Sequence, residues 1–189
     1  MLNMKTRKFF AFLAFSGLLL TGCSDDDDNP DPVNEEEVIT TMTIRLVPQG
    51  AGTTVILQSQ DLDGDGPNPP VIDVSGPFTA GTTYNGTIVL LNETEDPAEN
   101  ITEEVEEESD EHQFFFQVGS SLSATTSYAN FDGNGDPLGT AFVFEAQGAS
   151  TGTLTVTLRH EPKKPNDGTL SDAGGETDIA QTFDLAIIP

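Results

Sequence analysis

Residues 38–47 read VITTMTIRLV and indicate the fold class. In an extended chain, successive side chains of this stretch point to alternate faces, and the apolar residues concentrate on one of them. This period of two residues is typical of a half-buried β-strand. Its only charged side chain, Arg45, lies on the second face, so we expect the first face to point into the core. The residues of that first face are Val38, Thr40, Met42, Ile44 and Leu46.

The chain after this strand contains further short segments that are rich in β-branched or aromatic residues and bounded by Gly, Pro, Asn or Asp. We expect strands at residues 53–58, 87–92, 113–118, 123–129, 140–145, 153–160 and 179–188. About eight short strands predict an all-β fold, an antiparallel immunoglobulin-like β-sandwich. The cysteine pair and the buried tryptophan of immunoglobulin domains are missing, because the chain has one Cys and no Trp.

One segment has the pattern of a helix. Asp96 is a typical N-cap, and Pro97 suits the first helical position. Ala98, Ile101 and Val105 then fall on one helical face. We expect one short acidic helix from Pro97 to about residue 108.

The first 22 residues have the pattern of a lipoprotein signal peptide. Lys5, Arg7 and Lys8 precede an apolar run at residues 9–20, which is shorter than the roughly 20 residues of a membrane-spanning helix. The run ends just before Cys23, the only cysteine. We expect cleavage before Cys23 and its lipidation, then an acidic disordered tether over residues 23–36 and a β-sandwich domain over residues 37–189.

The charge of the predicted mature chain excludes one class of partner. Removal of residues 1–22 leaves four basic residues against 32 acidic ones, a formal charge of −28. A surface of this kind repels phosphates, so we expect no nucleic-acid binding. It attracts cations and basic partners instead.

The two histidines of the chain are candidate ligands for a transition ion. Each adjoins a glutamate at the edge of a predicted strand, and imidazole with carboxylate suits Zn²⁺. If the strands that begin at residue 113 and end at His160 are neighbours, both rings can approach one ion. The alternative is a pair of exposed loop histidines. The candidate ligands are His112, His160, Glu111 and Glu161.

A second candidate site is a calcium loop. Asp61, Asp63 and Asp65 alternate before a glycine, a spacing that lets carboxylate oxygens converge on Ca²⁺. Ile72 stands where an EF-hand would have its bidentate glutamate, and residues 130–136 form a looser copy of the loop. The alternative is that these Asp-Gly and Asn-Gly pairs simply build turns.

The sequence shows no catalytic centre. It has no Gly-x-Ser-x-Gly elbow and no phosphate-binding glycine loop, and lipidation would remove the thiol of Cys23. We therefore expect no enzyme activity. Arg159, Lys163 and Lys164 form the only basic cluster of the mature chain, and we expect them to contact the acidic helix or residues 172–178.

The residues from Asn92 to Phe115 and from Gly152 to Asp178 resemble a group of small Bacteroidota surface lipoproteins, often named "type 1 periplasmic binding fold superfamily protein". Cys23 followed by Ser-Asp-Asp-Asp-Asp is similar to the signal that sends such lipoproteins to the outer face of the outer membrane. The resemblance implies a membrane anchor and display at the cell surface, and the family name suggests a solute-binding role.

The leading hypothesis is a surface-exposed lipoprotein whose β-sandwich binds a divalent metal ion, as an accessory to an outer-membrane uptake receptor. The alternatives are a structural or adhesive module without a metal and a periplasmic-binding-type solute-binding protein. The distance between the rings of His112 and His160 separates the first hypothesis from the second.

Overall fold

The structure is a computed structural model that describes residues 37–64 and 66–189. The predicted signal peptide, Cys23 and the tether lie outside the described residues and stay predictions. In the part that is described, no helix is long and apolar enough to cross a membrane. The described residues form ten strands and two short helices, arranged as the expected all-β sandwich.

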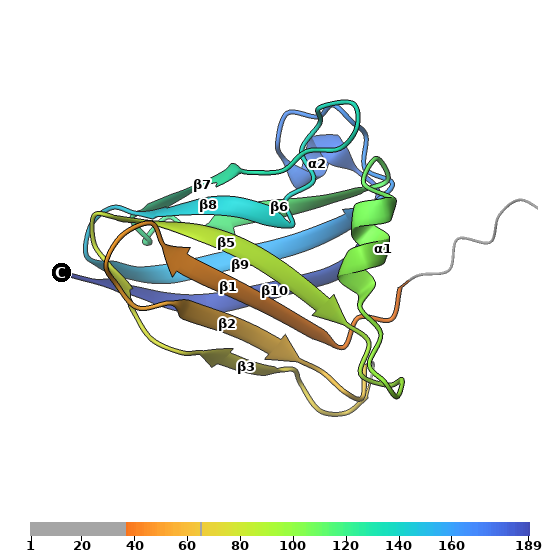
Figure 1. The fold of residues 1–189 in the computed structure, drawn as a ribbon, viewed down its shortest axis with the longest axis horizontal. Helices are drawn as coiled ribbons and strands as arrows, with labels where there is room; N and C mark the ends of the chain where they lie inside the picture. Colours follow the sequence, from red (N-terminus) through yellow and green to blue (C-terminus); the bar gives the residue numbers. More distant parts are fainter. Residues whose placement is uncertain (1–36, 65) are drawn as a thin grey trace, which may run out of the picture. The chain divides into compact units, whose positions relative to one another are not determined.

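One layer of the sandwich is a six-stranded sheet with the strand order β3-β2-β1-β5-β8-β7 (Figure 1). All neighbouring strands in it are antiparallel. The strands are β1 (Thr41–Pro48), β2 (Val55–Gln60), β3 (Val71–Val74), β5 (Thr82–Leu91), β7 (Ala124–Tyr128) and β8 (Ala141–Ala146).

The other layer is a four-stranded sheet with the order β4-β10-β9-β6. β6 and β10 both run antiparallel to β9, and β4 pairs in parallel with the end of β10. The sheet therefore places the start of β6 directly beside the end of β9. Its strands are β4 (Phe78–Thr79), β6 (His112–Val118), β9 (Ser150–His160) and β10 (Glu176–Ile188).

The core is built from the alternating apolar positions of both sheets. In β1, Met42, Ile44 and Leu46 are fully buried, as the alternation predicts, whereas Val38 precedes the strand and is exposed. Phe114 and Phe183 of the four-stranded sheet belong to the same core. Each fully buried side chain of this size contributes about 1.5–3 kcal/mol through the loss of apolar surface from water.

The helix α1 (Ile101–Glu107) lies at the end of the sandwich where β5 finishes and β6 begins (Figure 1). Its buried face is Ile101, Thr102 and Val105, and the Thr102 hydroxyl accepts a hydrogen bond of 2.7 Å from the backbone of Leu90 in β5. This attachment places the carboxyl end of α1 directly before β6.

The expected start of this helix at Pro97 is wrong. The backbones of Asn92 and Glu99 bond to each other in both directions at 3.0 Å, which keeps residues 92–99 in a loop. The helix begins after Asn100 instead. A second helix, α2 (Leu170–Ala173), was not expected from the sequence.

Candidate metal centre

The two histidines lie face to face at one end of the four-stranded sheet. His112 is the first residue of β6 and His160 is the last of β9, and the two are directly paired across the antiparallel ladder. Directly opposed residues project from the same face of a sheet. The ring centroids are 4.6 Å apart with an interplanar angle of 23°, and the two residues are 0% and 4% exposed. They are therefore not exposed loop histidines.

The hydrogen bond of His112 to the residue that directly follows α1 fixes which ring nitrogen carries hydrogen. Its Nδ1 lies 3.2 Å from the backbone oxygen of Glu108. A carbonyl oxygen can only accept, so Nδ1 is the donor. In the neutral ring, Nε2 then has a free lone pair.

That lone pair faces a carboxylate. Nε2 of His112 is 3.2 Å from Oε1 of Glu37, a residue that lies four positions before the start of β1. The two atoms are close but not aligned as a hydrogen bond; within the described part of the chain, His112 Nε2 and Glu37 Oε2 are buried and lack hydrogen-bond partners. Two acceptors at this distance in a dry site repel each other unless a cation lies between them. A proton or a metal ion can fill that role.

The pKa values of the pair follow from the same contact. Burial opposes the charged form of His112, but the Glu37 carboxylate, the Glu108 carbonyl and the Asp178 charge together outweigh burial and raise the pKa of His112 above its usual value. The same contact with His112 lowers the pKa of Glu37, against the effect of its own burial. The site therefore favours a positive charge between an ionised carboxylate and an imidazole.

Two further ligand atoms lie near this pair. One atom from each of Glu37, His112, His160 and Asp178 lies within 4.8 Å of the other three. We call these four residues the histidine cluster. Tetrahedral Zn²⁺ with bonds of 2.0–2.2 Å spaces its ligands at about 3.4 Å. The distance between Glu37 and His112 already meets this spacing, and modest side-chain movement would bring the others to it.

Asp178 reaches the cluster because β10 is irregular at this point. The pairing of β10 with β9 shifts register between Thr177 and Ile179. A bulge of this kind redirects the side chain of the extra residue. Neither Asp178 nor Glu37 was predicted as a ligand from the sequence.

The four ligands predicted from the sequence divide between two groups. His112 and His160 belong to the histidine cluster, whereas Glu111, His160 and Glu161 form a second group, also within 4.8 Å. Oε2 of Glu111 is 3.9 Å from Nε2 of His160, and the Glu111 side chain is 55% exposed. Because His160 belongs to both groups, a single ion that uses it can occupy only one of them. The histidine cluster is the more buried group, and it offers two imidazoles.

The predicted calcium loop has the hydrogen bonds of a turn. Oδ1 of Asp61 accepts from the backbone of Asp63 at 3.3 Å, and Oδ2 of Asp63 accepts from the side chain of Asn68 at 2.6 Å. The bond from Asn68 is the main cause that lowers the pKa of Asp63. Asp65 lies outside the described residues. Calcium binding here stays a prediction.

In the looser copy of that loop, other groups of the chain neutralise the Asp132 carboxylate. Asp132 accepts hydrogen bonds at 2.9 Å from the backbones of Asn134 and Asp136, and its other oxygen lies 3.2 Å from Nζ of Lys164. Lys164 also donates to the backbone oxygen of Ser109 at 2.7 Å. Its neighbour Lys163 pairs with Asp172 at 2.9 Å. The basic cluster thus contacts the 172–178 segment, one of the two expected partners, through Lys163, whereas Lys164 contacts Ser109, just beyond the end of α1.

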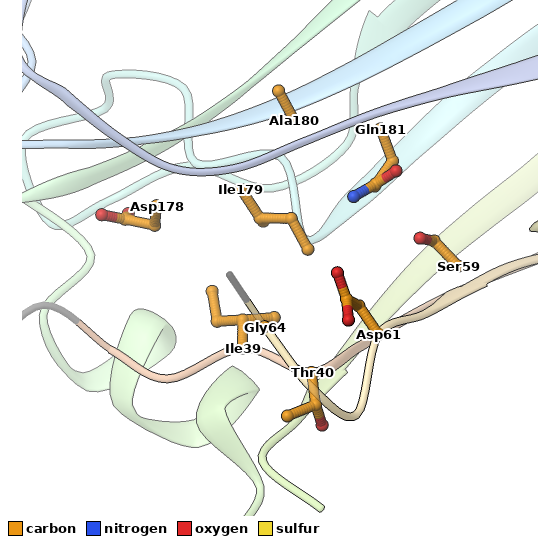
Figure 2. Close-up of a pocket in the computed structure, with 9 residues that line it drawn as sticks. All are labelled: Ile39, Thr40, Ser59, Asp61, Gly64, Asp178, Ile179, Ala180 and Gln181. Atoms are coloured by element: carbon orange, nitrogen blue, oxygen red, sulfur yellow. The ribbon is translucent and has the colours of Figure 1, made fainter. Parts of the chain in front are cut away.

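A pocket of about 360 Å³ lies next to the cluster, at the edge between β10 and the start of β1. Across it, Asp61 and Gln181 point toward one another, whereas the carboxylate of Asp178 points away from Asp61 (Figure 2). Asp178 is thus common to the pocket and to the histidine cluster, and the two histidines do not line the pocket.

Comparisons with protein-family models, with curated proteins and with solved structures found no match to this chain.

Proposed function

We propose that this domain binds a divalent transition-metal ion of the Zn²⁺ class in the histidine cluster. The observation that carries the proposal is the buried His112 Nε2, which has no hydrogen-bond partner among the described residues and lies 3.2 Å from Oε1 of Glu37. An ion between them would bond to both and replace their repulsion with two ligand bonds. The stacked ring of His160 supplies a second imidazole.

The donor set supports a transition ion rather than Ca²⁺. Calcium takes six to eight oxygen ligands, whereas the cluster offers two imidazoles with carboxylates. Nitrogen and oxygen donors in this ratio suit Zn²⁺ and its neighbours. The bond from Nδ1 of His112 to the Glu108 carbonyl is the outer contact that commonly orients a metal-binding imidazole.

The cellular setting of the proposal comes from the sequence. A lipidated Cys23 would anchor the domain to the outer membrane, facing outward, and the predicted charge of −28 would raise the local concentration of cations. A surface domain that captures metal ions suits an accessory of an outer-membrane uptake receptor. A purely adhesive module would not require the two histidines to meet, so their contact favours the metal-binding hypothesis.

The test is calorimetric titration of the full chain with Zn²⁺, Cu²⁺ and Ca²⁺, in a Cys23→Ser background so that the thiol does not bind metal. We expect one Zn²⁺ site with a Kd below about 10 μM, a range that indicates a dedicated site. A His112→Ala/His160→Ala variant should lose it. The matched control, Glu111→Gln/Glu161→Gln, should keep it because these residues belong to the second group.

Two results would contradict the proposal. One is a Zn²⁺ Kd above about 100 μM for the protein with all four residues of the histidine cluster intact. The other is undiminished binding in the double-histidine variant, provided that circular dichroism shows its sheet content to be unchanged.

A further inference from the structure

Glu37 belongs to a short segment with few attachments to the rest of the domain. We call Glu37–Ile39 the N-terminal arm. Its neighbour Thr40 makes the first backbone hydrogen bond to a strand, from its N–H to Leu91 of β5 at 3.0 Å. Within the arm, Val38 is 55% exposed and Ile39 is partly buried against the core. The described attachments of the arm are thus the packing of Ile39 and the contact of Glu37 with His112.

The contact of Glu37 links the two sheets of the sandwich. The arm leads into β1 of the six-stranded sheet, whereas His112 and His160 lie in β6 and β9 of the four-stranded sheet. Glu37 reaches across to them with a side chain that is 9% exposed. Among the cluster residues it is the one supplied by the arm, while the other three lie in or beside the paired strands of one sheet.

We propose, resting on the proposed function, that the bound metal ion clamps the N-terminal arm to the four-stranded sheet, so that ion binding and arm docking are coupled. An ion that takes Glu37 as a ligand binds more tightly to the docked arm than to the released arm. By linkage, the ion shifts the arm toward the docked state by the same free energy.

The coupling has a consequence for the membrane anchor. The arm continues along the sequence into the predicted tether of residues 23–36. Release of three residues would add about 10 Å of extended chain between the anchor and the domain. If Cys23 is lipidated, the ion would therefore change the length of free chain between that anchor and the domain.

The mobility of a spin label on the arm tests the coupling. A nitroxide on Val38→Cys, in the Cys23→Ser full chain, reports on the arm from an exposed position. We expect Zn²⁺ to slow the motion of this label. With Glu37→Gln added, Zn²⁺ should leave the label mobile, and the zinc Kd should weaken by about tenfold or more, because even outer-shell contacts contribute that much to metal affinity. Glu107→Gln, the same change on the exposed face of α1, should leave both readouts as in the parent.

The outcomes separate this proposal from the proposed function. If Zn²⁺ binds tightly but leaves the label equally mobile, or if Glu37→Gln binds Zn²⁺ as tightly as the parent, the clamp is wrong and the metal site stands. If the parent binds no Zn²⁺, both proposals fail.

Discussion

Two buried clusters of charged residues lie at the carboxyl end of α1, and they differ in how their charges are neutralised. In the Lys164 cluster, formed by Lys164, Asp132 and Ser109, the ammonium donates to the Asp132 carboxylate and to the Ser109 carbonyl. In the histidine cluster, Nδ1 of His112 donates to the neighbouring carbonyl of Glu108. Cations are favoured at both positions because the carboxyl end of a helix carries partial negative charge.

The two clusters differ in whether their remaining buried polar atoms have hydrogen-bond partners. Both oxygens of Asp132 accept hydrogen bonds, so the Lys164 cluster is complete. Of the contacts that the structure describes in the histidine cluster, Glu37 Oε2 and His112 Nε2 lack hydrogen bonds although they are buried. The chain therefore neutralises the buried Asp132 carboxylate with its own lysine. The Glu37 carboxylate has no such lysine among its described contacts, and a proton on His112 or a metal ion would neutralise it.

Loss of Lys164 should have the largest effect on stability. Lys164→Ala would leave the buried Asp132 carboxylate without its cation, and removal of one partner from a buried pair costs about 3–5 kcal/mol. Urea unfolding followed by circular dichroism measures this loss. A decrease below about 1 kcal/mol, the value of an exposed pair, would contradict the account of a complete buried cluster.

Changes of pH should affect the histidine cluster in two opposite ways. Without metal, the raised pKa of His112 stabilises the fold fully below the unfolded value of about 6.5, and this stabilisation is lost as pH rises through the folded pKa. The stability advantage of the parent over His112→Gln should therefore shrink from pH 6 to pH 9. Zinc affinity should rise over the same range, because the metal requires the unprotonated imidazole.

Urea unfolding and zinc titration at several pH values measure the two trends. Zinc affinity that is the same at pH 6 and pH 8 would contradict competition between proton and metal for one position.

Loss of Lys163 should have the smallest effect. This lysine is the sequence neighbour of Lys164 and also pairs with an aspartate, but its side chain is 61% exposed. Exposed pairs contribute at most about 1 kcal/mol. Lys163→Ala should therefore lower the free energy of unfolding much less than Lys164→Ala does. A loss equal to that of Lys164→Ala would show that burial does not separate the two lysines.

The fold was accessible from the sequence because strand alternation is a local signal. The face of β1 with Met42, Ile44 and Leu46 is buried as predicted. The edge strand β3 was missed because it is short and its apolar residues Val71 and Ile72 are exposed, so it has no buried alternating face. The helix begins later than expected because a β-bridge between Asn92 and Glu99, which the capping pattern at Asp96 and Pro97 does not reveal, holds this segment as a loop.

The site was only partly accessible from the sequence. From the sequence, His112 and His160 were expected to approach each other only if their two strands were neighbours. The structure pairs β6 with β9 and places the two histidines directly opposite each other. Glu37 gave no signal, because its contact depends on how the two sheets close on each other. Asp178 could have been considered from the antiparallel pairing of β9 with β10, but its direction depends on a local register shift.

The most direct test of the central claim is a crystal structure of the zinc-soaked protein, with the ion located by anomalous scattering at the zinc edge. We predict one strong peak at about 2.0–2.2 Å from a ring nitrogen of each histidine and from an oxygen of Glu37. A peak held only by Glu111 and Glu161, a peak only in the loop of Asp61 and Asp63, or no peak at all would contradict the claim that the histidine cluster is a metal site.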